Sequence, residues 1–321
     1  MEFSSNAIAY LGVVAVRSLG LAALAAAALF VFRLQAAAVR HAVWTVVVAG
    51  MLALAAIAPL TPAVPIRVLR AMPAPAAVAL SPDYASAVES GGAARRGAAA
   101  PATSLPHWRD AAVAVYAVGL LVMLIRLAFG YAFTVRLVRG SRKIERAWAA
   151  GIYESGWISV PLTVGWLRPE ILLPADWEQW DAAKLEAVLA HERTHVRRAD
   201  WAISVLAGLN RCVFWFHPLA WWLERRLASL AEQACDDSAL LEVATEPYAQ
   251  ALLDMAAAVK TGHGRLVWEA MAMAKASEVR KRIERILDET RQIPKGLTGR
   301  RWAALVACSL PLIYLAAALR P

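Results

Sequence analysis

Cysteine and histidine are both scarce in this chain of 321 residues, which contains three cysteines and six histidines. The cysteines, Cys212, Cys235 and Cys308, are odd in number, and no two of them have CxxC spacing. This pattern argues against a disulfide framework and against a cysteine-rich zinc site. Any metal in this protein must therefore be held by histidine and carboxylate side chains, and we expect Cys235 to be a small buried residue.

Charged residues are also few, at 18% of the chain, whereas 60% of the residues are hydrophobic and the mean hydropathy is +0.48. Ordinary soluble domains are apolar at roughly half of their positions. The formal net charge of +9 could reflect nucleic acid or an anionic membrane as partner. In a chain this apolar, basic residues that flank membrane spans explain the charge better. We therefore expect the lipid bilayer as a partner and no direct contact with nucleic acid.

Four apolar stretches are long enough to cross a bilayer as helices, which takes about 20 residues each. They are Ile8–Phe32, Ala42–Leu60, Ala111–Phe133 and Trp302–Leu319. The residues before the first stretch, MEFSSNA, contain no Lys or Arg, so this stretch is predicted to be a retained anchor and not a cleaved signal peptide. The predicted membrane segments are 1–60 with two spans, 111–133 with the third, and 300–321 with the fourth span and the C-terminus.

Clusters of basic residues indicate how these spans are oriented. They are Arg33 and Arg40 between the first two spans, Arg136, Arg139, Arg142, Lys143 and Arg146 after the third, and Arg291, Lys295, Arg300 and Arg301 before the fourth. Because such clusters stay on the cytoplasmic side, segment 134–299 is predicted to face the cytoplasm from a bacterial-type inner membrane. Segment 61–110 is rich in Ala, Pro, Gly and Ser and is expected to be a flexible extracytoplasmic linker, although five arginines within it weaken the charge bias.

Segment 134–299 mixes charge with apolar periodicity and is the part that can form a catalytic domain. Proline and β-branched residues in Trp157–Pro174 predict short strands or a hairpin at a sheet edge. The helices predicted after it are Ala182–Arg198, Asp200–Trp215, Pro218–Glu242, Pro247–Lys260 and Ser277–Thr290. Asp200 is expected to cap the second of these helices. The alternating charges of the last one are expected to form a solvated face.

The motif that carries chemistry is His191-Glu192-Arg193-Thr194-His195, an HExxH sequence on a predicted helix. Residues four apart share one helical face, so the imidazoles of His191 and His195 can point at one metal ion. Zinc suits two imidazoles and one carboxylate, with water as a fourth ligand. Glu192 is then placed to take a proton from that water and pass it to a leaving amine. The alternative is that the motif has no function and that its two histidines are exposed on the helix. The apolar face of the preceding residues continues into the motif, which favours a packed site.

A third ligand is needed, and several carboxylates on the following helices are candidates. They are Glu224, Glu232, Asp236, Asp237 and Glu242. Glu232 and Asp236 are again four residues apart, so one could bind the metal while the other orients a ligand imidazole. Spacing alone favours this arrangement no more than an ordinary charged helix face.

The strings HERTHVRRAD, FWFHPLAWW, EQACDD and PLTVGWLRPEILLP resemble the BlaR/MecR-type family of integral-membrane zinc peptidases. The resemblance implies His191 and His195 as zinc ligands, Glu192 as general base, Glu232 as third ligand and Asp236 as an acidic residue one turn later. It also implies a mainly α fold class: a polytopic membrane protein with four transmembrane helices and a gluzincin-like helical zinc peptidase domain with a small β element.

Antibiotic-sensing members of that family carry an outer penicillin-binding domain after the last span, whereas only Arg320 and Pro321 follow the fourth span here. This chain is therefore expected not to sense β-lactams itself, and a separate sensor protein or a homodimer is a candidate source of the signal. His217, which precedes Pro218 at a helix start, is a candidate to stabilise an oxyanion, although a structural role at the turn is the simpler interpretation.

The function that follows is a zinc-dependent endopeptidase that makes a regulatory cut in a cytoplasmic or juxtamembrane protein. A transcriptional repressor or the peptidase itself is the expected substrate. The alternative is a zinc-binding membrane scaffold that cleaves nothing, and the intact Glu192 argues against it. A transporter or channel with a chance HExxH is disfavoured by the large charged segment between the third and fourth spans.

Overall fold

The computed structural model describes residues 2–57, 64–65, 108–165, 168–261, 278–288, 290–294 and 298–320. These residues are mainly helical with one small four-stranded sheet, which confirms the predicted fold class. Most of the predicted linker 61–110 lies outside the described residues. Within it, β1 (Val64–Pro65) pairs in parallel with β6 (Leu319–Arg320).

Four helices are long and apolar enough to cross a membrane, as the hydropathy of the sequence predicts. They are α1 (Glu2–Val31), α2 (Ala37–Ile57), α4 (Trp108–Arg139) and α10 (Gly299–Ala318). The third helix is longer than the predicted span, because α4 continues past Phe133 into the basic residues that end at Arg139. Arg17, a charge within α1, donates a hydrogen bond of 3.0 Å to the carbonyl of Ala317 and so joins α1 to α10.

The sheet follows α4 and has the strand order β2-β3-β5-β4. Its strands are β2 (Arg142–Lys143), β3 (Ile152–Ser155), β4 (Leu162–Val164) and β5 (Glu170–Pro174). The predicted hairpin is present, since β4 and β5 are antiparallel, and β5 also pairs in parallel with β3. The strands β2 and β3 were not predicted, because they are too short to show a period in the sequence. This order leaves β4 at an edge of the sheet, beside α5.

The remaining described helices carry the candidate site. They are α5 (Ala182–Arg198), α6 (Asp200–Val213), α7 (Pro218–Ala239), α8 (Thr245–Thr261) and the helical residues 278–286. The predicted bounds of α5 are confirmed at both ends. Its start is fixed by Asp181, whose carboxylate accepts a 2.7 Å hydrogen bond from the N–H of Lys184, a cap that is worth about 1 kcal/mol.

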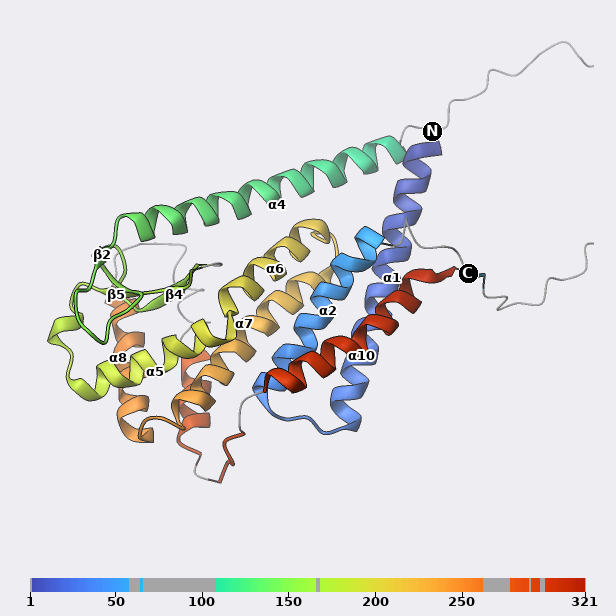
Figure 1. Cartoon of the computed structure of the whole chain (residues 1–321). Helices are drawn as coiled ribbons and strands as arrows, with labels where there is room; N and C mark the ends of the chain where they lie inside the picture. Colours follow the sequence, from blue (N-terminus) through green and yellow to red (C-terminus); the bar gives the residue numbers. More distant parts are fainter. Residues whose placement is uncertain are drawn as a thin grey trace, which may run out of the picture.

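Two elements of the site region pack directly on the candidate spans. Trp44, Met51 and Leu54 of α2 form one buried cluster with residues of α6 and α7, among them Ala207 and Leu223. Each such fully buried side chain contributes roughly 1.5–3 kcal/mol. Figure 1 shows α7 running from the spans toward α5, with the sheet, α5 and α8 at the far end of the molecule from α1 and α10. The helices α1, α2 and α10 therefore share one core with α6 and α7.

A second and a third cluster hold α5 in place at that far end. Under the sheet, Ile171 and Leu173 of β5 pack with Val188 and Leu189 of α5. On another side of α5, Ala187 and Ala190 pack with α7 and α8, where Tyr248 is the largest buried side chain. The helix with the HExxH motif is thus clamped between the sheet and two helices.

Candidate metal centre

The HExxH residues lie on the packed side of α5 as predicted. His191 and Glu192 each expose only 8% of their surface. The Nε2 atoms of His191 and His195 are 3.1 Å apart, so the two imidazoles converge on one point. The apolar face that the sequence shows before the motif is the face that packs under the sheet and against α8.

Glu232 of α7 completes a group of three ligands with the two histidines. Its Oε2 atom is 3.6 Å from Nε2 of His191, and its Oε1 atom is 3.6 Å from Nε2 of His195. Three atoms bound tetrahedrally to zinc at 2.0–2.1 Å are about 3.3–3.4 Å from one another. The two imidazole nitrogens, 3.1 Å apart, are close to that geometry, and each lies 3.6 Å from one oxygen of Glu232, so the residues present fit a zinc ion.

The other candidate carboxylates are engaged elsewhere. Glu224 pairs with Arg211 at 2.8 Å, and Glu242 pairs with Arg197 at 2.9 Å. Asp237 points toward the C-terminal helical segment, where it pairs with Arg285 and Arg291. Of the five carboxylates that the sequence left open, only Glu232 is grouped with both histidines among the described residues.

A second group of potential ligands, His195, Asp200 and Cys235, shares one histidine with the first. Burial raises the pKa of the Cys235 thiol far above its ordinary value, and the charge of Asp200 adds to this effect. A thiol must lose its proton to bind a metal. Asp200 is also already bonded to the other nitrogen of His195. The first group is therefore the better metal site, and Cys235 is the buried small residue that the sequence analysis expected.

His195 is supported by a carboxylate from the next helix. Its Nδ1 atom lies 2.9 Å from Oδ2 of Asp200, which also accepts a 3.1 Å hydrogen bond from Nε of Arg198. The contact depends on Ala199, whose φ of +53° turns the chain sharply between α5 and α6. For a residue with a Cβ atom, this left-handed conformation costs roughly 1–2 kcal/mol. This turn directs the side chain of Asp200 back toward His195 on α5.

The predicted capping role of Asp200 is wrong. The residue that precedes α6 is Ala199, and no side-chain hydrogen bond caps that helix. The carboxylate of Asp200 faces His195 instead, because the left-handed turn at Ala199 points it away from the N–H groups of α6.

His191 is supported by a relay of two side chains. The hydroxyl of Tyr248, on α8, lies 2.8 Å from Nδ1 of His191 and donates a 2.7 Å hydrogen bond to Oδ1 of Asp236. Asp236 is 1% exposed and is itself 3.5 Å from the same imidazole nitrogen. The structure therefore places Asp236 behind His191, a candidate ligand, with Tyr248 in contact with both residues.

Arg282 reaches this region from the helical residues 278–286. Its guanidinium pairs with Oε2 of Glu232 at 2.7 Å and with both oxygens of Asp236 at 2.7 and 2.9 Å. One turn later, Arg285 pairs with Asp237 at 2.8 Å. The prediction that the charges of this helix form a solvated face is wrong for these two arginines, because their residues face the carboxylates of α7.

Glu192 is held beside the metal-ligand group by the edge strand. The hydroxyl of Thr163, in β4, lies 2.7 Å from Oε2 of Glu192 and 3.2 Å from its backbone carbonyl oxygen. The sequence analysis did not single out Thr163, and its β-branched type indicated only a strand. The contact places the carboxylate of the expected base between α5 and the edge of the sheet.

His217 is not brought to this group. It precedes α7, fifteen positions before Glu232, which corresponds to about 22 Å along a helix. Its Nδ1 atom accepts a 3.1 Å hydrogen bond from the N–H of Leu219 and so caps α7. The structural interpretation of His217 agrees with this geometry, and a role as oxyanion stabiliser does not.

The electrostatics of the group favour a positive ion. Burial raises the pKa of Glu232, but the neighbouring His191 and Arg282 outweigh it and hold that pKa well below its ordinary range. Burial lowers the pKa of His195, but the hydrogen bond to Asp200 and the nearby glutamates outweigh it, so that pKa is raised. Glu232 is consequently a carboxylate at neutral pH, as a zinc ligand must be.

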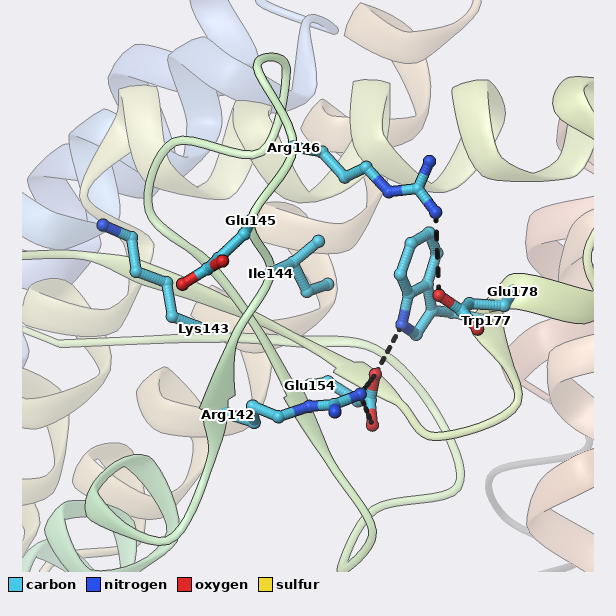
Figure 2. A pocket seen from close by; sticks show the side chains of 8 residues that line it. All are labelled: Arg142, Lys143, Ile144, Glu145, Arg146, Glu154, Trp177 and Glu178. Carbon is cyan, nitrogen blue, oxygen red and sulfur yellow. Dashed lines mark hydrogen bonds and ion pairs between the residues drawn. The ribbon is translucent and has the colours of Figure 1, made fainter.

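A separate pocket of about 370 Å³ lies beside the sheet (Figure 2). The indole Nε1 of Trp177 donates to Glu154 at 3.0 Å, and Arg142 pairs with the same carboxylate at 3.2 Å. Arg146 and Glu178 face each other across it at 3.8 Å. Both of these ion pairs lie within the pocket, and none of the predicted site residues lines it.

Comparison with known proteins places these features in a family context. A sequence model of the family described as BlaR1 peptidase M56 matches residues 15–286, which is more than half of the chain. The chain is 37% identical over 83 residues to the regulatory protein BlaR1 of Bacillus licheniformis, a stretch that covers 26% of this chain and 14% of that protein. It is 24% identical over 163 residues to the methicillin resistance mecR1 protein of Staphylococcus aureus, which covers 50% and 28% respectively. The aligned stretches span only a minor part of each relative's own length.

Proposed function

Because this chain belongs to the BlaR1 peptidase M56 family, we propose that it is a zinc-dependent endopeptidase whose active site is formed by His191, Glu192, His195 and Glu232. Family membership and the four apolar helices make it a membrane-associated metallopeptidase with several spans. The observation that carries the finer proposal is the convergence of two imidazoles and one carboxylate at spacings close to those of a zinc site, with a second carboxylate, that of Glu192, beside them.

His191, His195 and Glu232 would hold the zinc ion. When bound, zinc acidifies water and polarises a carbonyl group. Glu192 is the residue that moves the proton: its carboxylate takes a proton from water and delivers it to the nitrogen of the departing amine. Thr163 keeps the carboxylate in place through its 2.7 Å hydrogen bond. Asp200 and the Tyr248–Asp236 relay orient the imidazoles, so their ring planes need not reorganise during turnover.

The edge strand β4 offers a place for a peptide substrate. Among the strands that the structure describes, it pairs with β5 alone, and Thr163 in its middle touches Glu192. An extended peptide can add to such an edge through main-chain hydrogen bonds. We infer that the substrate is a protein segment in extended conformation, laid beside β4 so that one peptide bond comes next to Glu192.

The orientation and the role of the enzyme follow from charge and from the relatives. Basic residues cluster at the C-terminal end of α4 and before α10, which supports a cytoplasmic position of the peptidase part. In Figure 1 the starts of α1 and α4 lie close together, away from the sheet, so the outer ends proposed for these two spans are on the same side. Relatives named as regulatory and resistance proteins support a regulatory cut in a cytoplasmic or juxtamembrane protein, with a repressor or the chain itself as substrate.

The test separates metal binding from proteolysis. Glu192→Gln keeps both imidazoles and Glu232, so the purified full-length protein should retain stoichiometric zinc while cleavage is lost. His195→Ala removes a ligand and should lose both. New protein N-termini in cells with the wild-type chain, compared with cells that carry Glu192→Gln, would identify the substrate. Unchanged proteolysis in Glu192→Gln would refute the mechanism, and zinc binding without any cleavage by the wild type would favour a non-proteolytic scaffold.

A further inference from the structure

Both oxygens of Glu232 face the ligand histidines. Oε2 is 3.6 Å from Nε2 of His191, and Oε1 is 3.6 Å from Nε2 of His195. A carboxylate in this position can bind a metal through one oxygen or through both. What distinguishes the two oxygens is Arg282, whose Nη1 atom is 2.7 Å from Oε2.

We propose that Arg282 is a positioning residue that restricts Glu232 to one metal-binding oxygen, Oε1, and thereby keeps a fourth coordination position open for water. This inference rests on the proposed zinc site. It assigns a role to a residue that lies fifty positions after Glu232 in the sequence, on a helix whose charges look solvated in the sequence alone.

The guanidinium of Arg282 is fixed before it reaches Glu232. Nε and Nη2 bind the two oxygens of Asp236 at 2.9 and 2.7 Å, and Asp236 is 1% exposed. A planar, forked guanidinium held on two nitrogens presents its third in a defined direction. The side chain is only 15% exposed, so few other conformations are open to it. Arg282 therefore acts on Glu232 as a rigid arm.

An open position is what separates a catalytic zinc site from a structural one. If Glu232 bound through both oxygens, the second would occupy the place that water needs. An ion pair to Oε2 opposes this, since that oxygen would have to leave a charge-assisted hydrogen bond to reach the metal. The loss of Arg282 should therefore change how the metal is coordinated more than it changes how much metal the protein binds.

The matched control lies on the same helical segment. Arg285 also binds a carboxylate of α7, Asp237, at 2.8 and 2.9 Å, but that carboxylate is outside the metal-ligand group. Arg285→Gln removes an anchor of the helix without touching Glu232. Arg282→Gln removes an anchor and also frees Oε2. A merely structural role would give both variants the same metal spectrum.

The experiment uses the full-length protein in detergent, with cobalt in place of zinc as a spectroscopic probe and azide as a small anion for the open position. Wild type and Arg285→Gln should show the same visible cobalt absorption and the same azide-induced change. Arg282→Gln should bind one equivalent of cobalt, show weaker absorption because of a higher coordination number, and bind azide about tenfold to a hundredfold more weakly. Arg282→Lys keeps a cation beside Asp236 for folding but lacks the fork, so it should change in the same direction by less.

The outcomes distinguish the inference from the function on which it rests. If Arg282→Gln and Arg282→Lys give the wild-type spectrum and azide affinity, the role of Arg282 is refuted while the metal site stands. If the folded variants lose cobalt altogether, Arg282 is required for binding itself and the proposal is also wrong. If the wild type binds neither zinc nor cobalt, the proposed function fails.

Discussion

The two candidate ligand histidines, His191 and His195, lie one turn apart on α5, yet the side chains that support them differ. His195 rests on Asp200, five residues later in the chain, through one direct contact of 2.9 Å. His191 rests on a relay through Tyr248 and Asp236, with Tyr248 fifty-seven positions away. One support is therefore built by a local turn of the chain, and the other depends on the packing of three helices.

The two supports also connect to different parts of the molecule. Asp200 lies 3.8 Å from His41 of α2, a candidate membrane span. Asp236 is held by Arg282, from the segment that precedes α10. A displacement of α2 would act first on His195, whereas a displacement of the C-terminal segment would act first on His191 and Glu232. The candidate metal centre is thus connected to α2 and to the segment before α10 through separate side chains.

Removal of the direct support should have the largest effect. In Asp200→Ala, Nδ1 of His195 loses the carboxylate oxygen that lies 2.9 Å away, and Nε of Arg198 loses its 3.1 Å hydrogen bond. Partners of this kind are typically worth tenfold to a hundredfold in metal affinity. We expect zinc affinity to fall by about that factor, measured by competition with a chromophoric chelator.

Arg197→Ala is the control for this prediction, because its ion pair with Glu242 is more than 40% exposed on both sides and does not touch the metal ligands. Exposed pairs contribute about 0–1 kcal/mol, so zinc affinity should not change. Wild-type affinity in Asp200→Ala would show that the left-handed turn at Ala199 serves folding and not the metal centre.

The same contrast between local and distant contacts explains what could be predicted from the sequence. His191 and His195 share a face of α5 because helical periodicity alone aligns residues four apart, and the spacing of Glu232 and Asp236 follows the same rule. The role of Asp200 could not be predicted, since it depends on a left-handed Ala199 that residue preferences disfavour. The spacing of Asp200 five residues after His195 was the available signal.

The contacts between residues far apart in the chain were even harder to predict from the sequence than the role of Asp200. Tyr248 reaches His191 only because α8 folds back on α5, and Arg282 meets Asp236 across forty-six positions of sequence. A helix that alternates charges is compatible with solvent and with a row of carboxylates, and the choice depends on the tertiary fold. The pairing of Arg282 and Arg285 with the consecutive Asp236 and Asp237 is recognisable only once α7 is known to be their neighbour.

A variant of the relay should have a smaller effect than the loss of Asp200. Tyr248→Phe removes the hydroxyl between His191 and Asp236 but keeps the aromatic ring that packs in the third core cluster. Oδ1 of Asp236 is already 3.5 Å from Nδ1 of His191, so a modest shift restores a direct contact. We expect zinc affinity, measured by the same chelator competition, to fall by less than about tenfold. This is the low end of the range for residues that hydrogen-bond to a metal ligand. An effect as large as that of Asp200→Ala would show that the relay is not the weaker support.

The smallest effect should be a dependence of thermal stability on pH. We expect it for the His195–Asp200 contact and not for the Tyr248–Asp236 relay. In protein stripped of metal by a chelator, the pKa of His195 is raised and that of Asp200 is lowered: burial acts against each charged form, and the hydrogen bond between the two groups outweighs it. A raised histidine pKa stabilises the fold fully below the ordinary value of about 6.5, and this stabilisation is lost as pH rises through the folded pKa. The lowered pKa of Asp200 adds stability above the ordinary value of about 3.9, which is lost as pH falls through the folded pKa.

Wild type should therefore exceed Asp200→Asn in thermal stability most clearly between about pH 5 and 6. This difference in Tm should shrink toward pH 8.5 as His195 becomes neutral. Tyr248→Phe serves as the comparison, because the pKa of the Tyr248 phenol is raised by burial first and then by Asp236, so Tyr248 stays neutral over this range. Its difference in Tm from wild type should be the same at both ends of the range. A constant difference for Asp200→Asn as well would mean that Asp200 supports His195 by shape alone, and the electrostatic distinction between the two supports would disappear.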